Sequence, residues 1–200
     1  MLEAINLEAK DVFANLVPLV RSHAEVKQRG DASREKGRVG IPSIEFLGGT
    51  KIVLVVDTPD ALVWVDTPLF EAIGLGASAL DLATQNLRKR TQADLDLVPL
   101  RDDMPWAVRL ATGDRLDTGR LLLHDLWRRP REAIDGELLV RLATRHTVLA
   151  CSNRPEEVAF VDRLARTLAK DEGEVTDDFF AWTPTSWGEV ELPPELRAQR

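Results

Sequence analysis

The sequence predicts a single α+β domain, and three observations lead to this fold class. The chain has 200 residues, of which 44% are hydrophobic, so one domain can bury a sizeable core. Residues 51–66 (KIVLVVDTPDALVWVD) are typical of strand, turn and strand, and a proline-started helix follows at Thr67-Pro68. Residues 138–151 (LLVRLATRHTVLAC) repeat the pattern before a second such helix. We expect residues 1–200 to form a mixed sheet from two strand–turn–strand–helix units with flanking helices.

The first 50 residues are expected to form a helix, a loop and an edge strand. Apolar residues at helical spacing predict a helix over 7–28, which Pro18 should kink or divide. Residues 29–40 (RGDASREKGRVG) are charged and poor in apolar side chains, which favours a mobile loop. The strand over 41–47 should lie at a sheet edge because of Pro42.

A four-residue turn at 57–60 would close the first hairpin and place Lys51 opposite Asp66 as a cross-strand charge pair. A capping-box pattern then begins a helix over 78–90. Asn86 is unfavourable within a helix, so we expect its amide to satisfy a neighbouring main chain.

Residues 106–111 predict a strand, and Asp117 is a suitable N-cap for a helix that Pro130 ends. His124 falls on the side of that helix away from its apolar residues. The helix should therefore run over 117–129 with His124 outward.

In the second hairpin, a turn at 143–146 would place Leu138 opposite Cys151 on an apolar face. A helix over 155–170 and an acidic loop over 171–178 are expected to follow. Residues 179–200 contain too many aromatic side chains for a disordered tail, so this segment should dock on the core.

Composition excludes several classes of protein. A net charge of −7 argues against a nucleic-acid partner, which usually requires a basic surface. No apolar run is long enough to span a bilayer, and the acidic first segment is unlike a signal peptide. A single cysteine excludes a disulfide framework within the chain. Together these features predict a cytoplasmic protein without a membrane-bound part.

No catalytic group is assembled in the sequence. Cys151 and His146 are the tempting nucleophile and base, but the expected strand places them at opposite ends, with the thiol on the apolar face. The three histidines are far apart, and neither metal-ligand spacing nor a phosphate-binding glycine motif is present. We therefore expect no metal, cofactor or catalytic residue.

The candidate binding residues fall into a polar and an aromatic group. Arg145 can hold a carboxylate or phosphate through two parallel hydrogen bonds, unless it is solvated or pairs with the acidic 171–178 loop. Aromatic segments are suited to docking a partner. The candidates are Arg145, His146, Asp57, Trp106, Trp182 and Trp187.

The order of the elements resembles that of the YtpQ-like family of bacterial proteins, whose function is not established. The matching segments cover roughly residues 50–170 and are Val56-Asp57-Thr58-Pro59, Ala83–Arg88, Leu121–Trp127 and the hairpin around Thr144-Arg145 with its following helix. The family's turn is similar to Pro-Ser/Thr-Arg-Asp, where this chain has Ala143 and His146. The resemblance implies a bacterial, cytoplasmic α+β domain and brings no accepted catalytic residues.

The leading functional hypothesis is a non-enzymatic binding or regulatory protein with an unknown protein partner or small ligand. One alternative is a small hydrolase or transferase that uses the hairpin carboxylates Asp57 and Asp66 with Arg145. Another is a homodimeric scaffold joined through an open sheet edge. A pocket where Asp57, Asp66 and Arg145 converge would favour the enzyme.

Overall fold

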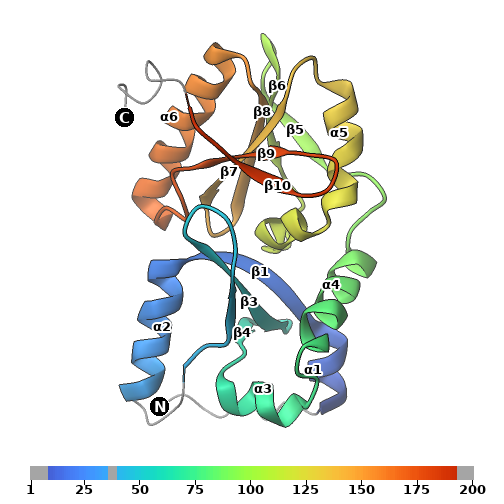
Figure 1. The fold of residues 1–200 in the computed structure, drawn as a ribbon, viewed down its shortest axis with the longest axis vertical. Helices are drawn as coiled ribbons and strands as arrows, with labels where there is room; N and C mark the ends of the chain where they lie inside the picture. The colour runs from blue at the N-terminus through green and yellow to red at the C-terminus, as the bar shows by residue number, and fades with distance from the viewer. Residues whose placement is uncertain (1–8, 36–39, 193–200) are drawn as a thin grey trace.

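The computed structural model describes residues 9–35 and 40–192, and it confirms the α+β class. The strands divide between two antiparallel sheets rather than joining in one mixed sheet. Every pairing joins antiparallel neighbours. Several of these pairs are hairpins whose short turns permit no other direction. In Figure 1 sheet A lies in the lower half of the molecule and sheet B in the upper half.

The first half of the chain forms sheet A and its helices. The elements are, in chain order, α1 (Ala9–Asn15), β1 (Leu16–Ser22), α2 (His23–Glu35), β2 (Ser43–Glu45), β3 (Thr50–Asp57), β4 (Leu62–Trp64), α3 (Thr67–Ile73) and α4 (Ser78–Arg90). β3 is central, with β1 on one side and with β2 and β4 along the other. One face of the sheet packs against α1, α3 and α4, and the other against α2, Leu116 and Leu123.

The second half forms sheet B, whose strand order is β10-β9-β7-β8-β6-β5. The elements are β5 (Leu97–Arg101), β6 (Met104–Leu110), the 3-10 turns η1 (Asp117–Leu122) and η2 (His124–Trp127), α5 (Arg128–Ala133), β7 (Leu138–Thr144), β8 (Thr147–Ser152), α6 (Pro155–Glu172), β9 (Phe179–Trp182) and β10 (Trp187–Val190). α6 covers one face of sheet B. The other face shares a core with Val20 of β1 and Ile52 of β3.

The expected helix over 7–28 is wrong, because β1 occupies its middle. The side chains of Val17 and Leu19 enter the core on one face of sheet A, and that of Leu16 enters the core on the other. A strand buried on both faces is a continuous apolar run, which periodicity alone does not distinguish from a helix. Pro18 is compatible with β1 because β1 is an edge strand.

The expected loop over 29–40 is also wrong for its first part, because α2 continues to Glu35. Arg29 approaches Glu25 at 3.4 Å and Arg34 approaches Asp31 at 3.3 Å, both at helical spacing. The helix therefore presents a charged outer surface, which had the composition of a loop. Residues 36–39 lie outside the described part of the chain.

The register of the first hairpin differs from the expected one by two residues. Asp57 lies opposite Leu62, because Thr58 closes the turn through hydrogen bonds with Ala61. Asp66 consequently does not face Lys51. Its carboxylate accepts from the Leu69 amide as the N-cap of α3.

The second hairpin has a two-residue turn, Arg145-His146, and a register shift between Leu142 and Thr144. Cys151 lies opposite Leu139 instead of Leu138. A slip of one residue moves a side chain to the other face of a sheet. Cys151 therefore packs under α6, where it is fully buried all the same.

Two helix starts differ from expectation. The helix at 78–90 forms, but its N-cap is Ala77 and no side chain caps it. The helix expected over 117–129 is instead η1, η2 and the first residues of α5. The carboxylate of Asp117 bonds Thr112 and Arg120, so it is not available as an N-cap. A strand over Leu97–Arg101 was not expected at all.

The acidic and aromatic segments at the end of the described chain belong to sheet B and its surroundings. α6 extends to Glu172, and Glu174 forms an isolated β-bridge with Thr144. β9 pairs with β7, and β10 pairs with β9. Phe179 and Phe180 are fully buried, whereas residues 193–200 lie outside the described chain.

Candidate functional site

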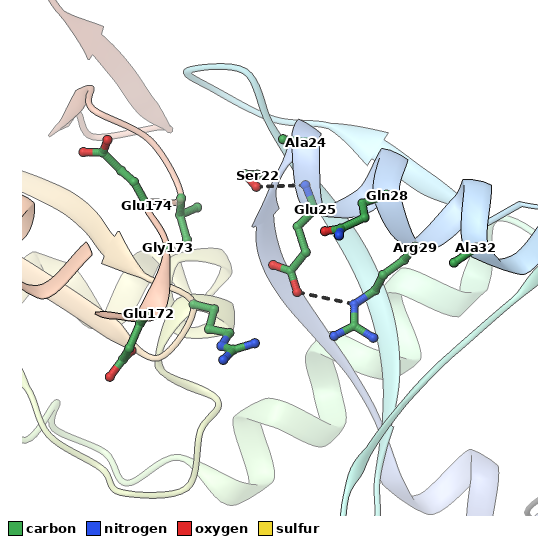
Figure 2. Close-up of a pocket in the computed structure, with 11 residues that line it drawn as sticks. Ser22, Ala24, Glu25, Gln28, Arg29, Ala32, Glu172, Gly173 and Glu174 are labelled. Carbon is green, nitrogen blue, oxygen red and sulfur yellow. Dashed lines mark hydrogen bonds and ion pairs between the residues drawn. The ribbon is translucent and has the colours of Figure 1, made fainter. Parts of the chain in front are cut away.

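A pocket of about 550 Å³ lies between the start of α2 and the loop that follows α6. The α2 side contributes Glu25, Gln28 and Arg29, together with two small alanine side chains. The other side is formed by residues 172–175 and by Arg145 from the turn between β7 and β8. The pocket thus joins residues from sheet A and sheet B that are more than 100 positions apart in the chain. Figure 2 shows this arrangement.

Three charged residues at the junction of β1 and α2 form a row. Arg21 Nε lies 3.7 Å from a Glu25 carboxylate oxygen, and Arg29 Nε lies 3.4 Å from the other. The Arg29 guanidinium also lies over the ring of Trp64, 4.4 Å from its centroid. Ser22 Oγ accepts from the Glu25 amide and so caps the first turn of α2. Glu25 is thereby fixed between two cations, one of which, Arg29, lines the pocket.

Arg21 is the buried member of this row, with 2% of its surface exposed. Its Nη1 donates to Thr118 Oγ1 at 2.8 Å and to the Val20 carbonyl at 2.9 Å. Burial lowers the pKa of Arg21 to about 10, and Glu25 opposes that shift. Arg21 therefore remains charged at neutral pH and contributes a positive field behind the pocket.

On the opposite side, the two glutamates of the 172–175 loop direct their carboxylates away from α2, as Figure 2 shows. Thr144 Oγ1 donates to Glu172 Oε2 at 2.7 Å. Glu174 Oε1 accepts from Arg141 Nη2, also at 2.7 Å. Arg141 is fully buried and forms a second ion pair with Asp162. Both carboxylates are therefore hydrogen-bonded on the side away from α2, and Glu174 is also paired with a buried arginine.

Arg145 has no such partner. Its side chain is exposed, and it forms no hydrogen bond or ion pair with any residue that the structure describes. The expected alternative, a pair with the acidic 171–178 segment, does not form. Arg145 and Arg29 therefore contribute two cations to the lining of the pocket, and Glu25 is the carboxylate on its α2 side.

This arrangement suits a small anionic group. The planar guanidinium has several donors in a fixed geometry that matches carboxylate and phosphate oxygens. The volume lies within the roughly 300–1,000 Å³ typical of small-molecule sites. Gln28 adds an amide, while Val175 and the alanines Ala24 and Ala32 add apolar surface.

The hairpin carboxylates are not part of this pocket. Asp57 forms an ion pair with Arg90, whose other nitrogen donates to Asn15 Oδ1 at 2.5 Å. Asp66 serves as the N-cap of α3. Neither residue lines the pocket that contains Arg145. The convergence that would favour a hydrolase or transferase at these residues is therefore absent from this pocket.

The predicted aromatic site residues contribute to the core instead. Trp187 is buried, and its Nε1 donates to the Leu121 carbonyl at 2.9 Å. Trp182 stacks on the His124 ring at 5.0 Å, so His124 packs inward against β9 and β10 and the expected outward position is wrong. Trp106 is half-buried beside the core shared by the two sheets.

His146 lies beside Arg145 but does not line the pocket. Its Nδ1 is buried and has no hydrogen-bond partner among the residues that the structure covers. Cys151 is buried at the far end of β8, and burial raises the pKa of its thiol. Over residues 9–35 and 40–192, no three His, Cys, Asp or Glu residues are grouped to hold a metal ion. No helix in those two stretches is long and apolar enough to cross a bilayer.

Sequence reasoning found Arg145 but missed the row of Arg21, Glu25 and Arg29. The signal was present, because these charges recur every four residues and alternate in sign. The expected helix ends at residue 28, so Arg29 falls in the expected loop and the row is interrupted after Glu25.

Comparison of the chain with protein-family models, with curated proteins and with solved structures finds no match in any of the three. The resemblance to the YtpQ-like family therefore stays a prediction. The function must be argued from the geometry of the site alone.

Proposed function

We propose that this protein is a non-enzymatic binding protein for a small ligand whose carboxylate or phosphate group is held by Arg145. The observation that supports the proposal is that the Arg145 guanidinium has no partner among residues 9–35 and 40–192, at a pocket where the neighbouring carboxylates are bonded to other residues. An anion placed there gains charge-assisted hydrogen bonds, each contributing about 1.5–3 kcal/mol. Arg29 supports the same anion from the opposite side of the pocket.

The lining residues favour binding over catalysis. Glu25 is the carboxylate on the α2 side, and its two oxygens already lie next to the guanidinium groups of Arg21 and Arg29. Ser22 Oγ accepts a main-chain hydrogen bond, and its contact is with an amide rather than with a base. A nucleophile requires an adjacent base, and none of the described lining residues supplies that pair.

Titration calorimetry with inorganic phosphate, sulfate and succinate tests the proposal and separates the two ligand chemistries. Saturable binding of phosphate and sulfate but not succinate indicates a phosphate site, and the converse indicates a carboxylate site. Arg145→Gln should weaken binding of the preferred anion at least tenfold, which corresponds to about 1.4 kcal/mol.

Arg163→Gln is the matched control, because Arg163 is also exposed but lies on α6 and does not line the pocket. The control should bind like the unaltered protein. Equal affinities of Arg145→Gln and Arg163→Gln, or no saturable binding of any of the three anions, would contradict the proposed function.

A homodimeric scaffold is a second candidate, and exposed apolar side chains at two sheet edges favour it. Ile44 on β2 is 52% exposed and Val98 on β5 is 44% exposed. Unpaired edge strands are templates for pairing with another chain. Sedimentation velocity of the unaltered chain and of Val98→Lys tests this, since a dimer joined through β5 should dissociate in the variant. We also propose that the protein is bacterial and cytoplasmic.

A further inference from the structure

His146 shares the two-residue turn with Arg145, and the surroundings of its ring bear on the anion site. In the two-residue turn, the His146 amide donates to Thr144 Oγ1 at 3.2 Å. That hydroxyl in turn donates to Glu172 Oε2, which fixes the turn against the end of α6. The His146 ring is half-buried with its Nδ1 out of contact with water and unpartnered among the described residues. A ring nitrogen in that state has no acceptor for the proton of an imidazolium.

The charged groups around His146 come from four elements and are mostly positive. They are Arg21 from β1, Arg145 from its own turn, Arg115 from the loop before η1 and Glu172 from α6. Burial lowers the pKa of His146 below its usual value, and the field of Arg21 and Arg145 adds to that effect. Glu172 opposes it, but it already accepts the Thr144 hydroxyl.

An anion on Arg145 would offset one of the cations that disfavour a proton on His146. Coupling between two binding events is reciprocal. If a bound anion raises the affinity of His146 for a proton, a proton on His146 raises the affinity of the site for the anion by the same factor. We propose that His146 is the proton-linked residue of this site, so that an anion on Arg145 binds together with a proton on His146. This inference rests on the proposed function and adds a regulation to it.

The affinity for the anion should depend on pH, because His146 has one pKa in the free protein and another in the complex. The pKa of His146 is higher in the complex than in the free protein. Affinity is therefore lowest at a pH above both pKa values, rises as the pH falls between them, and is constant below both. A difference of about one pKa unit between free and bound protein corresponds to a roughly tenfold change in affinity.

Calorimetric titration with sulfate tests the inference, because the charge of sulfate stays constant between about pH 5 and pH 8, where histidine titrates. We expect binding to be several-fold to roughly tenfold tighter near pH 5 than near pH 8. Repeating the titration in buffers of different ionisation enthalpy should show uptake of a fraction of a proton for each sulfate bound.

His146→Gln should bind sulfate with the same affinity at both pH values. His23→Gln is the control, since it removes an exposed histidine from the start of α2 and should keep the pH dependence. A measurement without substitution accompanies these variants: the NMR titration midpoint of the His146 ring should rise when sulfate is added.

Three outcomes would overturn the inference: sulfate binding that is equal at both pH values, pH dependence that persists in His146→Gln, or a His146 midpoint that sulfate does not move. Each leaves the proposed anion site standing if sulfate binds and Arg145→Gln weakens its binding at least tenfold. The absence of saturable binding of phosphate, sulfate and succinate at any pH would remove both proposals.

Discussion

At the scale of single residues, a buried amide connects two elements that the sequence did not place together. Asn86 on α4 donates from Nδ2 to the Phe13 carbonyl at 2.8 Å and to the Leu16 carbonyl at 3.0 Å. The expectation that this asparagine satisfies a neighbouring main chain is confirmed. The Leu16 carbonyl belongs to β1, so Asn86 hydrogen-bonds to the edge strand of sheet A.

Asn86→Ala should lower the free energy of unfolding by about 1–3 kcal/mol, because two main-chain carbonyls lose their donor in a buried place. Urea denaturation measures the change. Gln85→Ala is the control, since Gln85 is the exposed neighbour on the same helix and its change should stay within about 0.5 kcal/mol. A variant at position 86 as stable as the control would show that these hydrogen bonds contribute little.

The thiol of Cys151 should be unreactive in the folded protein. It is fully buried beneath α6, and burial raises its pKa, so the thiolate that attacks a thiol reagent is scarce. Labelling with a thiol reagent should be slow for the folded protein in buffer and fast for the protein unfolded in denaturant. Fast labelling under native conditions would mean that β8 opens readily near its end.

At the scale of elements, η1 packs directly on β1 at a glycine. A Cβ atom added to Gly119 would overlap the Pro18 carbonyl oxygen and crowd the side chain of Leu87. The short η1 turn therefore covers the edge of sheet A that Asn86 also partners. This edge is closed to a second chain, whereas β2 and β5 remain open.

Gly119→Ala should lower the free energy of unfolding by about 1–3 kcal/mol or more, because overpacking forces the main chain apart. Gly30→Ala is a control of opposite sign, since Gly30 lies within α2 and an added Cβ there meets no atom within 4 Å. Alanine at position 30 should stabilise the protein by roughly 0.5–1 kcal/mol. Thermal unfolding of the two variants measures both effects, and equal shifts in the same direction would contradict the close packing.

The elements that the sequence predicted well are those with a local signal. Pro155 at the start of α6 and the continuous apolar run of β3 are recognisable within a window of a few residues. The elements that were predicted wrongly, β1 and η1, depend on contacts with residues far away in the sequence. β1 pairs with β3 along its whole length, and η1 packs against Pro18 at Gly119, where an added Cβ atom would overlap a carbonyl oxygen.

The same distinction applies to the site. Arg145 could be found because a turn between two strands is exposed wherever the hairpin lies. The position of Arg29 beside it depends on how sheet A lies against sheet B, which no local pattern encodes. Hairpin register was off by one or two residues because both faces of each strand are apolar and hydrophobic patterning did not fix it.

At the scale of the whole molecule, the last described strands complete the core that both sheets share. Phe180 and Trp187 lie in that core, and Trp127 packs edge-on against Trp187 at 5.4 Å. β9 pairs with β7. Without β9 and β10, β7 would become the edge strand of sheet B. Residues 179–192 are therefore part of the folded domain.

Truncation after Asp178 should abolish cooperative unfolding, because it removes two strands and leaves buried apolar side chains in water. Near-ultraviolet circular dichroism and urea denaturation report the loss. Trp187→Phe is the milder comparison, since it keeps both strands but removes the hydrogen bond to the Leu121 carbonyl and part of a buried ring, and it should lower the free energy of unfolding by about 1–3 kcal/mol. A truncated chain that retains a sharp unfolding transition would show that the tail is dispensable.

The core shared by Val20, Ile52 and the inner side chains of sheet B also governs how the protein opens. Each sheet buries the apolar face of the other, so separating the sheets would expose both faces to water. The amides of β3 and of β7 should therefore exchange with deuterium through the same rare opening. Their exchange free energies should be equal and match that of global unfolding. A ligand bound where α2 meets the 172–175 loop would then slow exchange in both sheets at once, including strands that it never contacts.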